Sequence, residues 1–222
     1  MGCDIHLKLE KRLVKHIPSL KDKLDEKGKV IGEELDESFM KGMSGWYDKA
    51  MKEWRPVNIT FDRCWGDRNY GMFARLADVR NYWDDIKPMK PRGFPKDACK
   101  DTLRSYTYEL VPDDDYEKNK NRYESWDDAY VNETTGKEWL DKGYSVVMGE
   151  GYSNRKLISG PDWHSASWCT TKEMRKCVRA NFYSKKFGWN GDFIEWVSLL
   201  GAMEAIEKTG LYECRAVFWF DN

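Results

Sequence analysis

The sequence has few histidines, no surplus of charge of either sign, and no long apolar run. Three histidines, and six cysteines without a C-x-x-C pair, argue against a zinc knuckle. Acidic and basic residues leave a formal charge of −1, which argues against a nucleic-acid polymer as the main partner, because such binding rests on a basic surplus. No stretch reads as a membrane span or a signal peptide, so we expect a cytoplasmic protein without a membrane partner.

Familiar nucleotide and hydrolase motifs are also missing. The chain contains no P-loop, no G-x-S-x-G, no G-x-G-x-x-G and no EF-hand pattern. The composition is ordinary for a folded protein, with 41% hydrophobic and 34% charged residues over 222 positions. That length is enough for one buried core, so we expect a single domain over 1–222. The polar, acidic stretch 100–143 is interpreted as an insertion or peripheral lobe.

The two ends of the chain have the clearest strand patterns. Residues 3–10 alternate, with Cys3, Ile5, Leu7 and Leu9 on one face and Asp4, His6, Lys8 and Glu10 on the other. Residues 211–222 are apolar at almost every position, which is typical of a strand covered on both sides. We expect these strands to pair at the centre of one mainly antiparallel sheet. With the helices described next, the predicted fold class is α+β.

Three helices have clear N-terminal signals, a short fourth helix is expected in 44–54, and one proline-rich segment breaks the chain. Asp67 is the expected N-cap of a helix in 67–81, and Thr170 with Glu173 forms a capping box that starts another near 171. A third begins near Asp192 and ends before Gly210. Its predicted inward side chains are Ile194, Val197, Leu200 and Met203. The segment "KPMKPRGFP" at 87–95 is interpreted only as a break in the chain.

The first candidate for chemistry is "CDIH" at 3–6. Same-face residues two apart on a strand lie roughly 6.6–6.8 Å apart. Asp4 and His6 could therefore converge on one ligand, or Asp4 could hold the His6 ring in one tautomer. A polar pair on a solvated sheet face is the alternative.

The second candidate is "DWHSASW" at 162–168, just before a helix. It places His164, Ser165, Ser167 and Trp168 near helical N–H groups that suit an anion. Arginines and amides recur at Arg68, Asn69, Arg80 and Arg92, and arginine binds phosphate or carboxylate through two parallel hydrogen bonds. The alternatives are that the serines only shape a turn and that the arginines form surface ion pairs.

Taken together, the motifs resemble a set of uncharacterised bacteriophage and prophage proteins. The resemblance is carried by "MGCDIH", by "DRNY" and "LADVRN" within 67–81, by "PRGFP" at 91–95, by "DWHSASW", and by "VFWFDN" at the end. It implies a phage origin and a host bacterial cytoplasm, and it implies no activity. Members typically carry an H-S-H-S-W element, in which Ala166 stands here in place of the second histidine.

These elements suggest one pocket with three interpretations. Asp4, His6 and His164 would be its catalytic groups, and Arg68, Asn69, Arg80, Arg92, Ser165, Ser167 and Trp168 would bind the ligand. The first hypothesis is hydrolysis of a small nucleotide-type phosphoester to counter host defence signalling, with one histidine taking a proton and the other giving it. The second is sequestration of such a ligand without turnover, and the third is a protein-binding inhibitor. Asp4, His6 and His164 could also hold a divalent metal. The sequence is compatible with either a monomer or a homo-oligomer.

Overall fold

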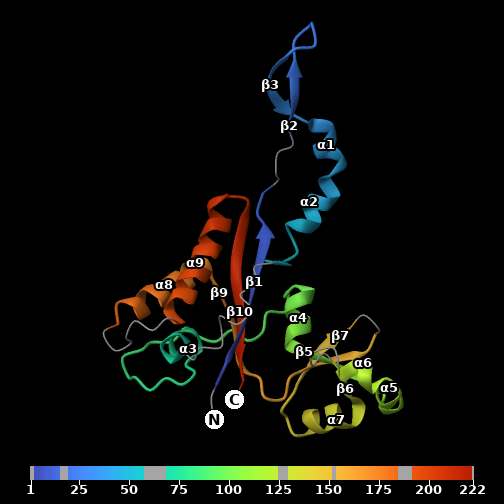
Figure 1. Ribbon diagram of the computed structural model, residues 1–222, viewed down its shortest axis with the longest axis vertical. Helices are drawn as coiled ribbons and strands as arrows, with labels where there is room; N and C mark the ends of the chain where they lie inside the picture. Colours follow the sequence, from blue (N-terminus) through green and yellow to red (C-terminus); the bar gives the residue numbers. More distant parts are fainter. Residues whose placement is uncertain are drawn as a thin grey trace.

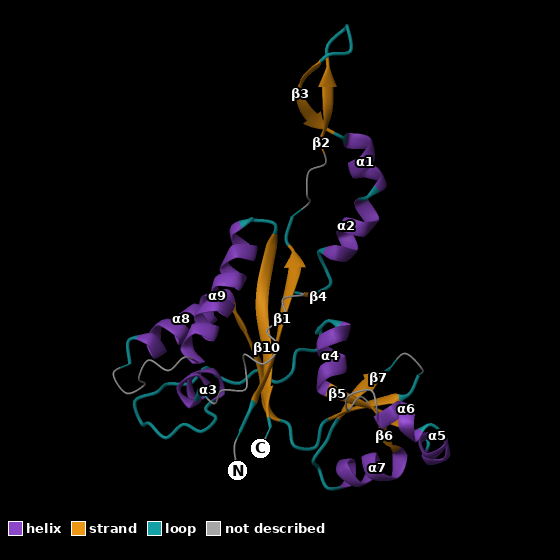
Figure 2. Cartoon of the chain, in the orientation of Figure 1, coloured by secondary structure: helices purple, strands orange, loops and turns teal. Residues whose placement is uncertain are grey.

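The computed structural model describes residues 3–15, 20–57, 69–124, 130–151, 154–184 and 192–221. It confirms the α+β class: within these ranges helices and strands are mixed along the chain, and the described strands form three sheets (Figures 1 and 2). The prediction of a single sheet is therefore wrong. No helix in these ranges is long and apolar enough to cross a membrane.

The central sheet is built on the two terminal strands, as predicted. Its order is β4 (Arg55–Pro56), β1 (Ile5–Leu13), β10 (Tyr212–Phe220) and β9 (His164–Thr170). Strands β1 and β10 pair antiparallel from Ile5↔Phe220 to Leu13↔Tyr212. This register brings the start and the end of the described chain together at one end of the sheet (Figure 1).

Three helices cover one face of this sheet: α3 (Tyr70–Ala77), α8 (Thr171–Phe182) and α9 (Asp192–Lys208), all on the same side in Figure 1. The capping box predicted for α8 is present. The Thr170 side chain accepts a hydrogen bond from the Glu173 backbone N–H, and the Glu173 side chain accepts one from the Thr170 backbone N–H. Helix α3 begins later than expected, at Tyr70, and its N-cap is Asn69. The predicted cap Asp67 lies outside the described residues.

Helix α9 buries a different stripe from the one predicted. Ile194 and Val197 are exposed, whereas Phe193, Trp196 and Leu199 are buried. The other two predicted inward residues, Leu200 and Met203, are buried as expected. Both stripes have helical spacing, but only one carries the two large aromatic rings, and burying those rings removes more apolar surface from water.

The other face of the central sheet carries a buried charge network. Glu10 on β1 and Arg215 on β10 are cross-strand partners, and Arg215 Nε lies 2.7 Å from Glu10 Oε2. Arg215 also donates to Asp97 Oδ1 at 2.8 Å, just before helix α4 (Lys100–Tyr106). The network therefore ties the central strands to the chain segment that covers them.

A second sheet follows α4 and contains the predicted insertion. Its strand order is β6 (Tyr130–Asn132), β5 (Thr107–Val111), β8 (Lys156–Ser159) and β7 (Val147–Glu150). Three short helices accompany it: α5 (Asp113–Lys118), α6 (Lys120–Glu124) and α7 (Glu133–Asp141). Leu110, Val131 and Ile158 form its small core. The stretch 100–143 thus builds most of a lobe that is completed by residues up to 159.

The third sheet is a hairpin at the end of an arm. Strands β2 (Leu20–Leu24) and β3 (Val30–Leu35) turn at Gly28, which has the positive φ of 77° that glycine tolerates. Helices α1 (Glu37–Gly42) and α2 (Ser44–Ala50) connect this hairpin to the body, and the arm projects away from it in Figure 1. Every residue of both strands is exposed.

Candidate functional site

His6 is oriented by a carboxylate from the far end of the chain. Its Nε2 lies 3.1 Å from Asp221 Oδ2, and its ring stacks on Trp219 with centroids 5.4 Å apart and planes 8° apart. The backbone N–H of Asp4 donates to Asp221 Oδ1 at 2.9 Å, and Asp221 N–H donates back to Asp4 O at 3.2 Å. The carboxylate that contacts the ring is therefore that of Asp221, where the sequence suggested Asp4.

His164 lies on the opposite face of the same sheet. It pairs with Phe220 on β10, stacks with that ring at 6.0 Å, and has Nε2 4.0 Å from the buried Cys3 thiol. Cys3 and Phe220 belong to the core under α3, α8 and α9. His6 instead pairs with Trp219, and successive side chains of a strand point to opposite faces. The prediction that Asp4, His6 and His164 share one pocket is therefore wrong.

A β-bulge in β9 explains the error. The register runs Phe218↔Ser167 and then Phe220↔His164, so β9 has one residue more than β10 between these pairs. Ser165, in this stretch, has a φ of 50°, and its Oγ lies 3.0 Å from His164 Nδ1. A one-residue shift reverses the face of every side chain beyond it. Regular alternation would have placed His164 on the face of Trp168.

The predicted metal ligands do not form a metal site. Within the described ranges, no three His, Cys, Asp or Glu side chains gather closely enough to hold an ion. His6 is separated from His164 by the sheet itself. The donor set proposed for a divalent metal is thus not assembled.

The other predicted ligand-binding residues separate into different roles. Asn69 caps α3, because its side-chain oxygen accepts a hydrogen bond from Met72 N at 3.0 Å. Arg80 has a positive φ of 51°, and its hydrogen bond with Tyr82 raises the pKa of the guanidinium. Arg68 lies outside the described residues.

Arg92, Ser167 and Trp168 are brought together. The Arg92 backbone N–H donates to Ser167 Oγ at 3.1 Å, and its guanidinium lies 4.4 Å from the centre of the Trp168 ring. The same guanidinium binds both carboxylate oxygens of Glu173 at the start of α8. Arg92 thereby links the predicted "HSASW" element to the helix that follows it.

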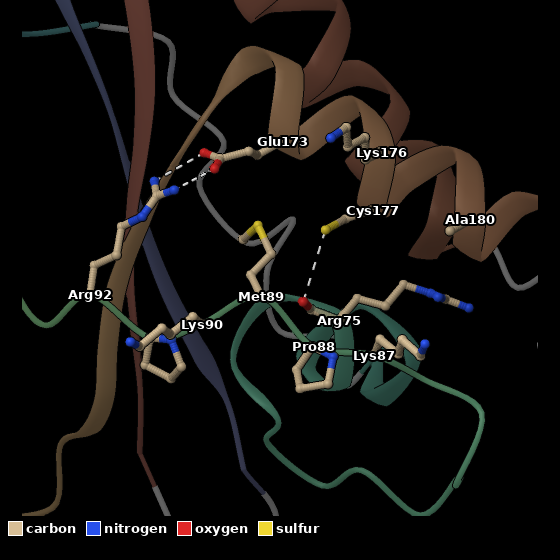
Figure 3. A pocket seen from close by; sticks show the side chains of 11 residues that line it. Arg75, Lys87, Pro88, Met89, Lys90, Arg92, Glu173, Lys176, Cys177 and Ala180 are labelled. Carbon is tan, nitrogen blue, oxygen red and sulfur yellow. Dashed lines mark hydrogen bonds and ion pairs between the residues drawn. The ribbon is translucent and has the colours of Figure 1, made fainter.

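Arg92 is also one end of a groove of about 720 Å³ between α3, α8 and the segment 87–92 (Figure 3). In Figure 3 the side chains of α8 line one side and the 87–92 segment the other. Its charged side chains are Arg75, Lys87, Lys90, Arg92, Lys176 and Glu173. Pro88, Met89, Pro91, Cys177 and Ala180 complete the lining.

Two anchored amides hold the 87–92 segment in place. Pro88 and Pro91 have no backbone N–H to satisfy, and each restricts its own φ. Met89 N donates to Arg75 O at 2.8 Å, and Arg92 N donates to Ser167 as described above. The segment is fixed at these two points, and the exposed side chains of Lys87 and Lys90 extend from it.

The groove is strongly basic, and the pKa values of its carboxyl group and of its thiol are both shifted away from neutral pH. Burial alone would raise the pKa of Glu173, but hydrogen bonds from Arg92 and Thr170 outweigh it and lower this pKa to about 2. Burial raises the pKa of the Cys177 thiol to about 11. At neutral pH Glu173 is ionised and paired, and Cys177 is a neutral thiol.

The low pKa of Glu173 predicts an acid-sensitive contribution to stability. A carboxyl whose pKa falls from 4.5 to about 2 on folding stabilises the fold above pH 4.5, and this contribution is lost as the pH falls to 2. Glu173→Gln should remove about 1–2 kcal/mol at pH 6, once solvent screening is allowed for, and almost nothing at pH 2. Urea unfolding at both pH values measures this, with Glu133→Gln on α7 as the control. An equal loss at both pH values would contradict it.

Comparisons of the chain with protein-family models, curated proteins and solved structures found no match. The resemblance to phage proteins therefore stays a prediction. Sequence analysis missed Arg75, Lys87, Lys90 and Asp221. A signal was present for the two lysines, since "KPMKPR" places three cations among prolines that stiffen the backbone.

Proposed function

We propose that the protein binds a small phosphate-bearing ligand in the groove between α3, α8 and residues 87–92. The observation that carries this is the charge of the lining: among the lining residues that the structure describes, five side chains are cationic and Glu173 is the one acid. Within the described residues Lys87, Lys90 and Lys176 form no ion pair. Guanidinium and ammonium groups gathered on one cavity are the usual protein partners of phosphate.

The apolar part of the lining points to a ligand that is more than a bare anion. Pro88, Met89, Pro91 and Ala180 add apolar surface, and a volume of about 720 Å³ is in the range of small-molecule sites. A nucleotide has both parts, a charged phosphate and a flat base that packs on apolar side chains. A nucleotide-type ligand is therefore the class proposed.

Binding without turnover is the mode the groove favours. Among its described lining residues, the one carboxylate is held in an ion pair, the thiol is neutral, and there is no histidine. General acid–base catalysis needs a group whose pKa lies near the working pH. The second sequence hypothesis, sequestration, fits this groove better than hydrolysis there.

The biological setting belongs to the same proposal. The sequence resemblance implies a phage protein acting in the host bacterial cytoplasm. A protein that binds a nucleotide signal without consuming it would lower the free concentration of that signal and so counter a host defence response. The support for this step is the resemblance together with the basic groove.

The test is calorimetric titration of the whole protein with ATP, cyclic AMP and pyrophosphate, comparing wild type with Lys87→Glu/Lys90→Glu. We expect the variant to bind at least about tenfold more weakly, because it loses two charged contacts and gains two repulsive ones. Raising the salt concentration should weaken binding to the wild type, since exposed charges are screened.

The matched control is Lys27→Glu/Lys29→Glu in the arm. It changes the net charge by the same amount on exposed side chains of another part of the molecule. The control should bind like the wild type. Equal weakening in both double variants, or no heat of binding with any of the three probes, would contradict the proposal.

A further inference from the structure

A second, smaller recess lies on the face of the central sheet that carries His6. Its volume is about 380 Å³, and its walls include His6, Arg104, Asp162, Trp163 and Asp221. Arg104 comes from α4, Asp162 from the turn before β9, and Asp221 from the residue after β10. This recess is separate from the basic groove, with which it shares no lining residue.

The His6–Asp221 pair in this recess is fixed from both sides. Asp221 Oδ1 is held by Asp4 N at 2.9 Å, so its Oδ2 is aimed at His6 Nε2 at 3.1 Å. The imidazole is stacked on the buried Trp219 and lies 5.9 Å from the Trp163 ring. Both side chains are therefore already held in place before a ligand binds, as catalytic groups must be to act efficiently.

Because Nε2 of His6 is hydrogen-bonded to Asp221, the other ring nitrogen, Nδ1, is the one that can act as a base. A carboxylate beside Nε2 favours the tautomer in which Nε2 carries the proton and donates it to Asp221. Nδ1 then has a lone pair, and no described residue forms a hydrogen bond with it. The His6 side chain is 41% exposed, so water and a small substrate can reach the imidazole.

The charged side chains on the walls limit the charge of the substrate that the recess can bind. Arg104 forms no ion pair within the described ranges and can bind one anionic group. Asp162 and Asp221 bring two negative charges into the same recess. A phosphodiester carries a single negative charge and fits this balance, whereas the dianion of a phosphomonoester would be repelled.

We infer that this recess hydrolyses small phosphodiesters, with His6 Nδ1 as the general base. Nδ1 takes a proton from a water molecule while the water oxygen forms a bond to phosphorus. The bond from phosphorus to the leaving oxygen breaks, and that oxygen keeps the electron pair. The imidazolium then returns its proton to solvent. Asp221 is a positioning residue that stabilises the imidazolium, and Arg104 binds the negative charge of the substrate.

The experiment uses the whole protein with bis(4-nitrophenyl) phosphate and follows 4-nitrophenolate release as a function of substrate concentration. The wild type should release 4-nitrophenolate. His6→Gln keeps a side-chain N–H for Asp221 but removes the base, and should lower the rate by about 100-fold or more. Asp221→Asn should lower it at least about tenfold through kcat with little change in KM, because the ring is no longer held in its tautomer and the imidazolium loses its carboxylate.

The matched control is His164→Gln, the same change on the opposite face of the same sheet. It should leave the rate unchanged, and thermal unfolding should show that all three variants are folded. No release by the wild type, equal loss in His6→Gln and His164→Gln, or faster cleavage of 4-nitrophenyl phosphate or 4-nitrophenyl acetate would overturn the inference. The recess is tested by 4-nitrophenolate release and the groove by heats of binding, so the two sites are tested independently.

Discussion

Replacing Arg215 with methionine is expected to lower the free energy of unfolding by about 3–5 kcal/mol. The change leaves the Glu10 carboxylate buried without its cation, and an unpaired buried charge costs several kcal/mol. Glu10 has a side chain that is 0% exposed and Arg215 one that is 3% exposed, so water cannot replace the lost partner. Chemical denaturation near neutral pH measures the effect.

The surrounding contacts explain why the loss should be large. Glu10 Oε1 accepts a hydrogen bond from Cys99 N at 2.7 Å, and Arg215 lies 4.0 Å from the centre of the Trp54 ring. Asp97 accepts from both Arg215 and Trp54. Removing the guanidinium therefore disturbs the central strands and the segment that leads into α4 together.

Two further variants test whether the unpaired charge of Glu10 causes the loss of stability. Glu10→Leu/Arg215→Met leaves no unpaired charge and should recover part of the loss seen in the single variant. Arg12→Met removes a neighbouring arginine on β1 whose partner Glu213 is 42% exposed, and should cost less than about 1 kcal/mol. If Arg215→Met cost no more than Arg12→Met, the buried network would not stabilise the fold as argued.

The pairing of the two terminal strands and the start of α8 could be predicted from short stretches of sequence. The alternation of residues 3–10 and the apolar run at 211–220 were enough to place β1 beside β10, because a strand buried on both faces must lie inside a sheet. Thr170 and Glu173 specified the start of α8, since the capping box uses only neighbouring residues. Each of these signals is contained within a short stretch of chain.

The candidate sites depended on contacts that no short stretch contains. Asp221 meets His6 only because the terminal strands pair in one particular register. The groove forms where α3, α8 and residues 87–92 pack together, so its cations come from three separate segments, and α8 lies about 80 residues beyond the other two. The face of His164 was set by the bulge near Ser165, a serine with positive φ at which the sequence shows no glycine or asparagine.

Helix α9 shows the same limit within a single element. Its sequence has apolar residues on all sides, so helical spacing allowed two stripes that share Leu200 and Met203. Tertiary packing selected the stripe with Phe193 and Trp196, against the core formed by α3, α8 and the central sheet. Periodicity alone could not make that choice, because it does not weigh side-chain size.

Trp196→Ala is therefore expected to destabilise the protein by about 3–5 kcal/mol, and Val197→Ala by less than about 1 kcal/mol. The two residues are neighbours in the same helix, yet Trp196 is 2% exposed and Val197 is 46% exposed. Truncating the indole leaves a large cavity in the main core, whereas truncating the valine removes a side chain that already contacts water and slightly raises helix propensity. Thermal and urea unfolding of the two variants measure the difference. Similar losses, or a larger loss for Val197→Ala, would mean that α9 packs through the stripe first predicted from the sequence.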